Sequence, residues 1–108
     1  MTDRRTQLAE LAVNLAELVE VLRHDPRCQW THHFESCLAS TELLAAGNPT
    51  QSEINELSGS VMHVFGGMGS FNDYAPWQNG RTIPGMEALT DASGNVYQSA
   101  FALRVVEA

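Results

Sequence analysis

The sequence has 108 residues, and its 13 acidic and 6 basic residues give a formal net charge of −7 at pH 7. That length predicts one domain, residues 1–108, with room for a hydrophobic core. Because a negative surface repels phosphate groups, the charge argues against partners such as nucleic acid or an anionic membrane. No stretch approaches a membrane span, and the N-terminus lacks the uninterrupted apolar region of a signal peptide. We therefore expect a cytoplasmic protein.

The N-terminal segment carries the clearest helical pattern. Thr2 or Asp3 can cap its start, and Asp25-Pro26 ends it because the residue before a proline is driven out of the helical region. Its apolar residues recur at spacings of three and four, which places them on one face of a helix. They are Leu8, Leu11, Ala12, Leu15, Leu18, Val19 and Leu22.

Two more helices are predicted before residue 66. The second follows Pro26 and ends at a glycine C-cap, Gly47. The third begins at Thr50, which forms a capping-box pattern with Glu53. Gly59 in its middle either costs up to about 1 kcal/mol relative to alanine or marks close packing on a neighbour. The inward faces are Trp30, Phe34, Cys37, Leu38, Thr41, Leu44 and Ala45 in the second helix, and Ile54, Leu57, Val61, Val64 and Phe65 in the third.

The C-terminal part combines a long loop with a last helix. Residues 66–85 lose periodicity, although the Asn-Gly pair at 79–80 favours a short hairpin over 77–82. Residues 86–106 are predicted to be helical, either as one helix or as two split at 91–95. The apolar residues that indicate this helix are Met86, Leu89, Val96, Tyr97, Ala100, Phe101 and Leu103. The fold class is therefore all-α, a compact bundle of about four helices with a long glycine-rich loop between helices three and four.

The glycine-rich loop is the most distinctive segment. Such loops bind phosphate where their N–H groups lie at a helix N-terminus, whereas these glycines follow a helix C-terminus and no lysine accompanies them. We interpret the loop as structural, with a glycine as left-handed C-cap and the apolar side chains of 68 and 71 returning to the core. Its structural residues are Gly66, Gly67, Met68, Gly69, Ser70, Phe71 and Asn72.

A cluster of two cysteines and two histidines suggests a metal site. We place Cys28 and Cys37 in the second helix, nine positions apart and too distant for a disulfide. Cys28 then shares a face with His32, and Cys37 with His33. Adjacent histidines diverge by about 100° around a helix, so the four side chains cannot converge on one ion. We predict no metal and no other cofactor, with Cys37 as an inert buried thiol.

The sequence shows no catalytic constellation. Ser70 does not lie in the G-x-S-x-G elbow of hydrolases, and no strand precedes it. We therefore predict that the chain is not an enzyme. A small enzyme or metal-binding protein centred on residues 66–73 and His63 is the alternative from another class.

Acidic side chains outnumber arginines on the first three helices. Such a face suits docking of a basic protein, because complementary charge speeds the encounter and sets specificity. Aromatic residues of the long loop would anchor the contact. The residues predicted to bind the partner are Glu35, Glu42, Glu53, Glu56, Asp73, Tyr74 and Trp77.

The stretch from Phe65 to Asp73 (FGGMGSFND) resembles the signature of a family of small, mostly helical bacterial domains of unknown function. In that family, as here, a helix bearing a tryptophan precedes the stretch. The likeness covers residues 5–75, and after Asp73 this chain has Tyr74-Ala75-Pro76-Trp77 where an aliphatic run is expected. The resemblance implies a helical build and no specific activity.

In size, charge and helical build, the chain is similar to immunity proteins of bacterial toxin systems. We therefore predict a non-catalytic protein-binding domain, an immunity protein that neutralises a cognate toxin by covering its active site. The alternative within the binding class is a structural or regulatory adaptor, or a homodimer formed through a helix face.

Overall fold

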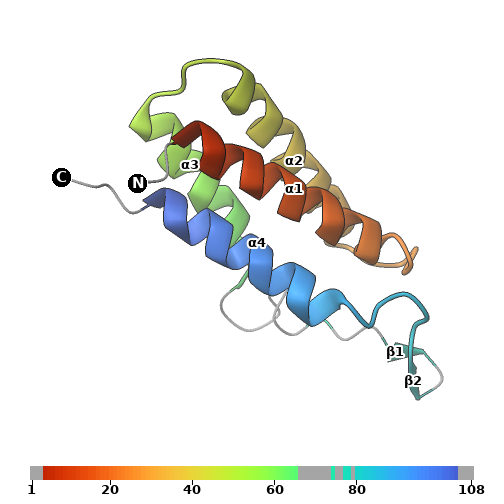
Figure 1. The fold of residues 1–108 in the computed structure, drawn as a ribbon. Coiled ribbons are helices and arrows are strands. Elements are labelled where there is room, and N and C mark those ends of the chain that lie inside the picture. The colour runs from red at the N-terminus through yellow and green to blue at the C-terminus, as the bar shows by residue number, and fades with distance from the viewer. Residues whose placement is uncertain (1–3, 66–73, 75–76, 79, 105–108) are drawn as a thin grey trace.

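In the computed structural model, four helices form a bundle, and a small hairpin lies beyond one of its ends (Figure 1). The structure describes residues 4–65, 74, 77–78 and 80–104. The elements are α1 (Arg4–Leu22), α2 (Thr31–Ala46), α3 (Gln51–Met62), the 3₁₀ turn η1 (His63–Phe65), β1 (Trp77–Gln78), β2 (Arg81–Thr82) and α4 (Leu89–Arg104). The predicted all-α bundle of about four helices is confirmed.

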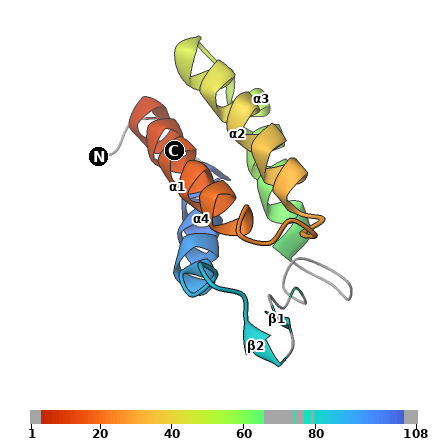
Figure 2. The same ribbon diagram turned by 90° about the vertical axis from the view of Figure 1, so that its right-hand side faces the viewer.

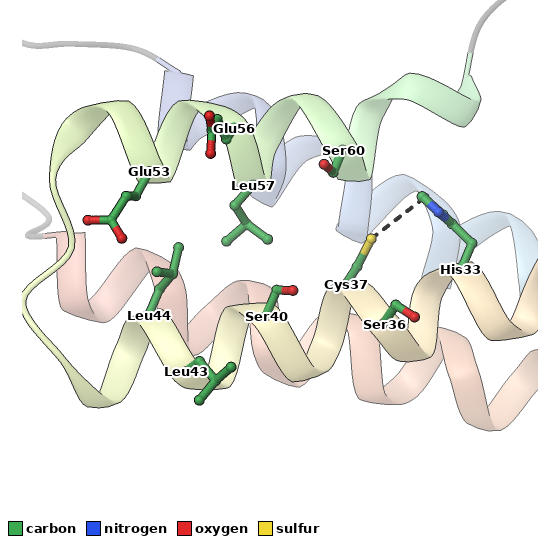
Figure 3. A pocket seen from close by; sticks show the side chains of 10 residues that line it. All are labelled: His33, Ser36, Cys37, Ser40, Leu43, Leu44, Glu53, Glu56, Leu57 and Ser60. Atoms are coloured by element: carbon green, nitrogen blue, oxygen red, sulfur yellow. Dashed lines mark hydrogen bonds between the residues drawn. The ribbon is translucent and has the colours of Figure 1, made fainter.

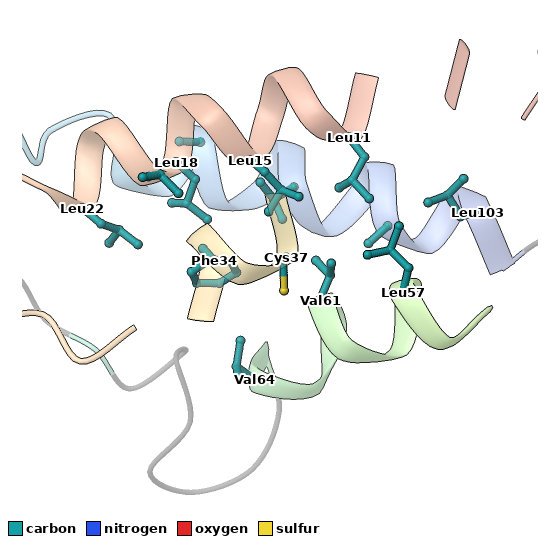
Figure 4. Close-up of a cluster of buried hydrophobic side chains, with 14 of the residues drawn as sticks. Leu11, Leu15, Leu18, Leu22, Phe34, Cys37, Leu57, Val61, Val64 and Leu103 are labelled. Atoms are coloured by element: carbon teal, nitrogen blue, oxygen red, sulfur yellow. The ribbon is translucent and has the colours of Figure 1, made fainter. Parts of the chain in front are cut away.

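The apolar stripe of α1 forms the centre of the core. Its five leucines recur every three or four residues, about one helical turn apart, and each is at most 1% exposed. Side chains of α2, α3 and α4 converge on them (Figure 4). Burying a leucine contributes roughly 1.5–3 kcal/mol, so this stripe provides much of the driving force for assembly. The buried leucines are Leu8, Leu11, Leu15, Leu18 and Leu22.

The helices are not packed evenly around the bundle. α1 packs against both α2 and α4, and α3 packs against α4, whereas α2 and α3 touch each other only sparingly. In the view of Figure 2, α1 and α4 lie on one side and α2 and α3 on the other, although α2 and α3 make few contacts with each other. The sparse contact between α2 and α3 leaves room for a groove between these two helices.

Polar side chains fix the register of α4. On α1, Asn14 donates from Nδ2 to the Ser99 hydroxyl at 2.5 Å. On α3, the buried Ser58 hydroxyl donates to the carbonyl oxygen of Ala100 at 2.7 Å. A buried hydroxyl needs such a partner because leaving it unpaired costs about 1–3 kcal/mol. The sequence pattern did not predict the burial of Ser58.

The predicted capping box at the start of α3 is confirmed. The Thr50 hydroxyl accepts from the backbone N–H of Glu53 at 3.1 Å, and the Glu53 carboxylate accepts from the N–H of Thr50 at 2.9 Å. Gly47 is the C-cap of α2, as expected, and its N–H donates to the Leu44 carbonyl at 3.2 Å. Its backbone is extended, with φ −113°, instead of left-handed.

The start of the second helix differs from the prediction. α2 begins at Thr31, so Cys28 lies in the preceding turn and the placement of both cysteines in one helix was wrong. The Asp25 carboxylate accepts a hydrogen bond from the backbone N–H of Arg27 at 3.0 Å. The backbone carbonyl oxygen of Asp25 accepts one from the N–H of Cys28 at 3.1 Å. These turn bonds compete with helix formation. Cys28 and Cys37 are both free thiols.

α4 is one continuous helix through Gly94, which answers the question of a split at 91–95. Its buried stripe consists of Ala92, Val96, Ala100 and Leu103. Tyr97 and Phe101 are 41% and 53% exposed, so these two of the apolar residues that indicated the helix lie outside its buried stripe. Tyr97 directly follows Val96, and Phe101 directly follows Ala100. Because one step along a helix turns a side chain by about 100°, both aromatic residues point away from the buried stripe.

The short hairpin expected from the Asn-Gly pair is present. β1 and β2 pair antiparallel, with Trp77 opposite Thr82 and Gln78 opposite Arg81. Gly80 has φ +76°, as a tight two-residue turn requires. The loop residues 66–73, with the predicted glycine C-cap and the core contacts of Met68 and Phe71, lie outside the described residues.

We expect Gly59→Ala to raise the free energy of unfolding by about 0.5–1 kcal/mol, because alanine loses less backbone entropy in a helix. A Cβ at this exposed position would meet nothing within 4 Å, which excludes the close packing considered above. Urea denaturation followed by circular dichroism measures the change. The matched control is Gly85→Ala, which should destabilise, because Gly85 has φ +91° and its Cβ would collide with the His24 ring. Equal effects at both positions would contradict this explanation.

Candidate functional site: a groove between α2 and α3

A groove runs between α2 and α3 (Figure 3). These two helices contact each other less than the other packed helix pairs do. Its volume is about 450 Å³, within the range of pockets that bind ligands. Three serines, Ser36, Ser40 and Ser60, lie along its walls, and their small side chains leave the space open. The other lining residues are His33, Cys37, Leu43, Leu44, Glu53, Glu56 and Leu57.

The middle of the groove is apolar. Leu44 from α2 and Leu57 from α3 lie across from each other, and Leu57 is only 5% exposed (Figure 3). Leu43 lies at the outer edge and is 76% exposed. A leucine exposed to that degree beside an apolar floor extends the surface that a partner could cover.

One wall of the groove is acidic. Glu53 and Glu56, both exposed, lie one turn apart on α3 and line it together. The pKa of His33 is lowered from its ordinary value, mainly because the side chain is partly buried. A hydrogen bond with the Ser60 backbone raises this pKa, whereas the electrostatic effect of His63 lowers it. The His33 imidazole is therefore neutral at pH 7. Among the lining residues that the structure describes, no lysine or arginine offsets the two carboxylates.

Cys37 and His33 lie on the same face of α2, as their spacing of four predicted. The Cys37 Sγ and His33 Nε2 atoms are 3.6 Å apart. Burial raises the pKa of the Cys37 thiol to about 11. The pair is thus a neutral thiol beside a neutral imidazole, and the prediction that Cys37 is a buried thiol is confirmed. In the described part of the chain, no three His, Cys, Asp or Glu residues are placed to share a metal ion.

The four glutamates predicted to bind a partner do not form one surface. Glu53 and Glu56 line the groove, whereas Glu35 and Glu42 do not. The latter two are seven positions apart and so share another face of α2. Glu35 accepts from the Arg23 guanidinium at 3.1 Å, and both side chains are exposed. An exposed ion pair of this kind contributes little to stability.

The aromatic anchors predicted in the long loop have different outcomes. Tyr74 is half-buried against the core, and its hydroxyl donates to the Asp25 carboxylate at 2.5 Å. Burial, together with this hydrogen bond, raises the pKa of Tyr74. Tyr74 thus attaches the long connection to the turn after α1. Trp77 belongs to β1, but its side chain, like the whole of Asp73, lies outside the described residues.

Leu43 and the three serines were not predicted from the sequence to be parts of a site. One signal was available. Leu43 and Leu44 are adjacent, so in a helix they diverge by about 100° and cannot both occupy the centre of one buried face. The sparse contact between α2 and α3 has no counterpart in the local sequence.

Residues 23–84 match the model of a family described as a domain of unknown function (DUF6966). The chain belongs to this family. The matched range contains α2 and α3 with the whole groove, the stretch 65–73 and the hairpin, while α1 and α4 lie outside it. No curated protein and no solved structure matches the chain. No helix in the described ranges is long and apolar enough to cross a membrane.

We expect Cys37 to react with iodoacetamide at least tenfold more slowly than Cys28 in the native protein at pH 8. The thiolate is the reactive form, and a pKa of about 11 leaves roughly one Cys37 thiol in a thousand ionised at that pH. Cys37 is also buried, while Cys28 is half-buried. Mass spectrometry of timed digests measures both rates, and a urea-unfolded sample is the control. Similar rates in the native protein would contradict the assignment of Cys37 as an inert thiol.

Proposed function

We propose that this chain is a non-catalytic protein-binding domain, an immunity protein that neutralises a toxin by covering the toxin's active site. The observation that supports the proposal is the α2–α3 groove, which combines an apolar floor with two carboxylates and no offsetting arginine or lysine among its described residues. Such a groove suits a basic, partly apolar segment of another protein.

The groove specifies the chemistry of that segment. An arginine or lysine of the partner would lie along Leu43 and Leu44 with its aliphatic stem and place its cationic head near Glu56. Small apolar side chains would fill the space beside the serines. Hot spots of this kind combine a desolvated apolar contact with a charge pair.

The net charge of −7 fits a basic toxin cleft. Proteins that act on nucleic acid carry basic clefts, because their substrate is a polyanion. An acidic protein approaches such a cleft quickly and blocks it without needing chemistry of its own. An adaptor that binds a basic partner would use the same groove, so the partner's identity distinguishes the two functions.

The test is co-expression with a candidate toxin domain encoded beside this gene. Growth should be rescued, and the two proteins should elute together on gel filtration. A stable complex without rescue would favour the adaptor. Neither rescue nor complex, with any toxin domain of the neighbouring genes, would overturn the proposal.

Glu56→Lys should lower the association rate with the basic partner by about tenfold at low salt and flatten its salt dependence, because long-range attraction is lost. Surface plasmon resonance at several salt concentrations measures the rate. Glu10→Lys on α1 is the matched control, since it changes the net charge equally at an exposed site outside the groove. Glu53 is unsuitable because it also caps α3. If both variants slow association equally, the groove is not the binding surface.

Leu43→Ala should weaken binding by about tenfold, the usual size for losing a well-covered apolar side chain. Its stability should stay within about 0.5 kcal/mol of the parent, because Leu43 is 76% exposed. Val13→Ala on α1, where Val13 is 58% exposed, is the control. Isothermal titration with the partner and urea denaturation give the two quantities. Unchanged affinity for Leu43→Ala would place the interface elsewhere.

A further inference from the structure

α4 carries two large aromatic side chains on its solvent side. The rings of Tyr97 and Phe101 stack at 6.4 Å between centroids with an interplanar angle of 13°, and both are more than 40% exposed. Phe65 from η1 meets Tyr97 edge-on at 5.4 Å. Exposed aromatic pairs of this kind are typical of protein interfaces.

A hollow lies next to these rings and extends from Tyr97 toward the N-terminal end of the same helix. Its volume is about 380 Å³, and its lining residues are Phe65 of η1 and Thr90, Ser93, Gly94, Tyr97 and Gln98 of α4. Gly94 is in the middle of a helix, where glycine costs about 1 kcal/mol relative to alanine. A Cβ at this position would meet nothing within 4 Å, so packing inside this chain does not require glycine there.

The hollow and the projecting ring have the relation that a symmetric pair needs. Gly94 and Phe101 are seven positions apart, which is about two helical turns, so they lie on one face of α4. If two copies of α4 pack antiparallel about a twofold axis near Tyr97, position 101 of each copy faces position 94 of the other. This is an isologous contact, in which each surface is its own complement.

We propose that two copies of this chain associate through antiparallel α4 helices, with Phe101 of one copy inserted into the hollow beside Gly94 of the other. The charge pattern supports a second copy as the occupant. The face formed by Thr90, Gly94, Tyr97 and Phe101 is uncharged, although the chain as a whole carries −7. Two such acidic chains can meet on this face without opposing carboxylates at its centre.

Sedimentation equilibrium tests the association. The mean mass of the parent should rise from 11.8 kDa toward twice that value between micromolar and millimolar concentration. Phe101→Glu should remain monomeric over this range. Val13→Glu, which adds the same charge at an exposed apolar site on α1, should associate like the parent. A parent chain that stays monomeric throughout, or a Phe101→Glu variant that still associates, overturns the proposal.

Disulfide trapping tests the geometry. The variants Gly94→Cys and Phe101→Cys, purified separately and mixed under mild oxidation, should form a cross-linked heterodimer faster than either variant forms a homodimer. Peptide mapping identifies the 94–101 link, because native Cys28 and Cys37 give different peptides. Equal rates for all pairs overturn the antiparallel register. Neither experiment uses a toxin, so the outcome is independent of the proposed function.

Discussion

The structure depends on the burial of one leucine stripe on α1. The five leucines contact α2 on one side and α4 on the other, and α3 joins the bundle mainly through α4. The polar contacts of Asn14 and Ser58 with α4 then set the register of helices that apolar packing has already brought together. Hydrophobic burial provides the energy, and hydrogen bonds select one arrangement.

The groove follows from this order of packing. Because α2 is held by α1 and α3 is held by α4, the two helices do not need extensive contact with each other. Their facing surfaces can therefore carry serines and glutamates without exposing the core. The capping box holds the carboxylate of Glu53 at the start of α3. Glu56, the other acidic side chain on this wall, is not part of the capping box. The groove is thus a surface that folding leaves available for binding.

The groove beside α3 and the aromatic face of α4 differ in charge. Glu53, Glu56 and Ser60 line the groove toward α2, whereas Ser58 faces α4. The aromatic face of α4 is uncharged and the groove is acidic, so the two surfaces suit different partners. The family match covers the groove but not α4, so the α4 contact concerns a part of the chain outside the matched range.

Features that depend on near neighbours along the chain could be predicted from the residues alone. The leucine stripe of α1, the capping box at Thr50, the Asn-Gly turn and the burial of Cys37 all follow from residues within one or two turns of each other. Which helix faces are covered by a neighbour became clear from the packing of the four helices. Helical periodicity identifies an apolar face but not the neighbour that buries it. It therefore could not show that Tyr97 and Phe101 remain exposed or that Leu43 lies at the edge of a groove. Nor could it show that Glu35 and Glu42 lie apart from Glu53 and Glu56. Those outcomes depend on contacts between helices that are distant in the sequence.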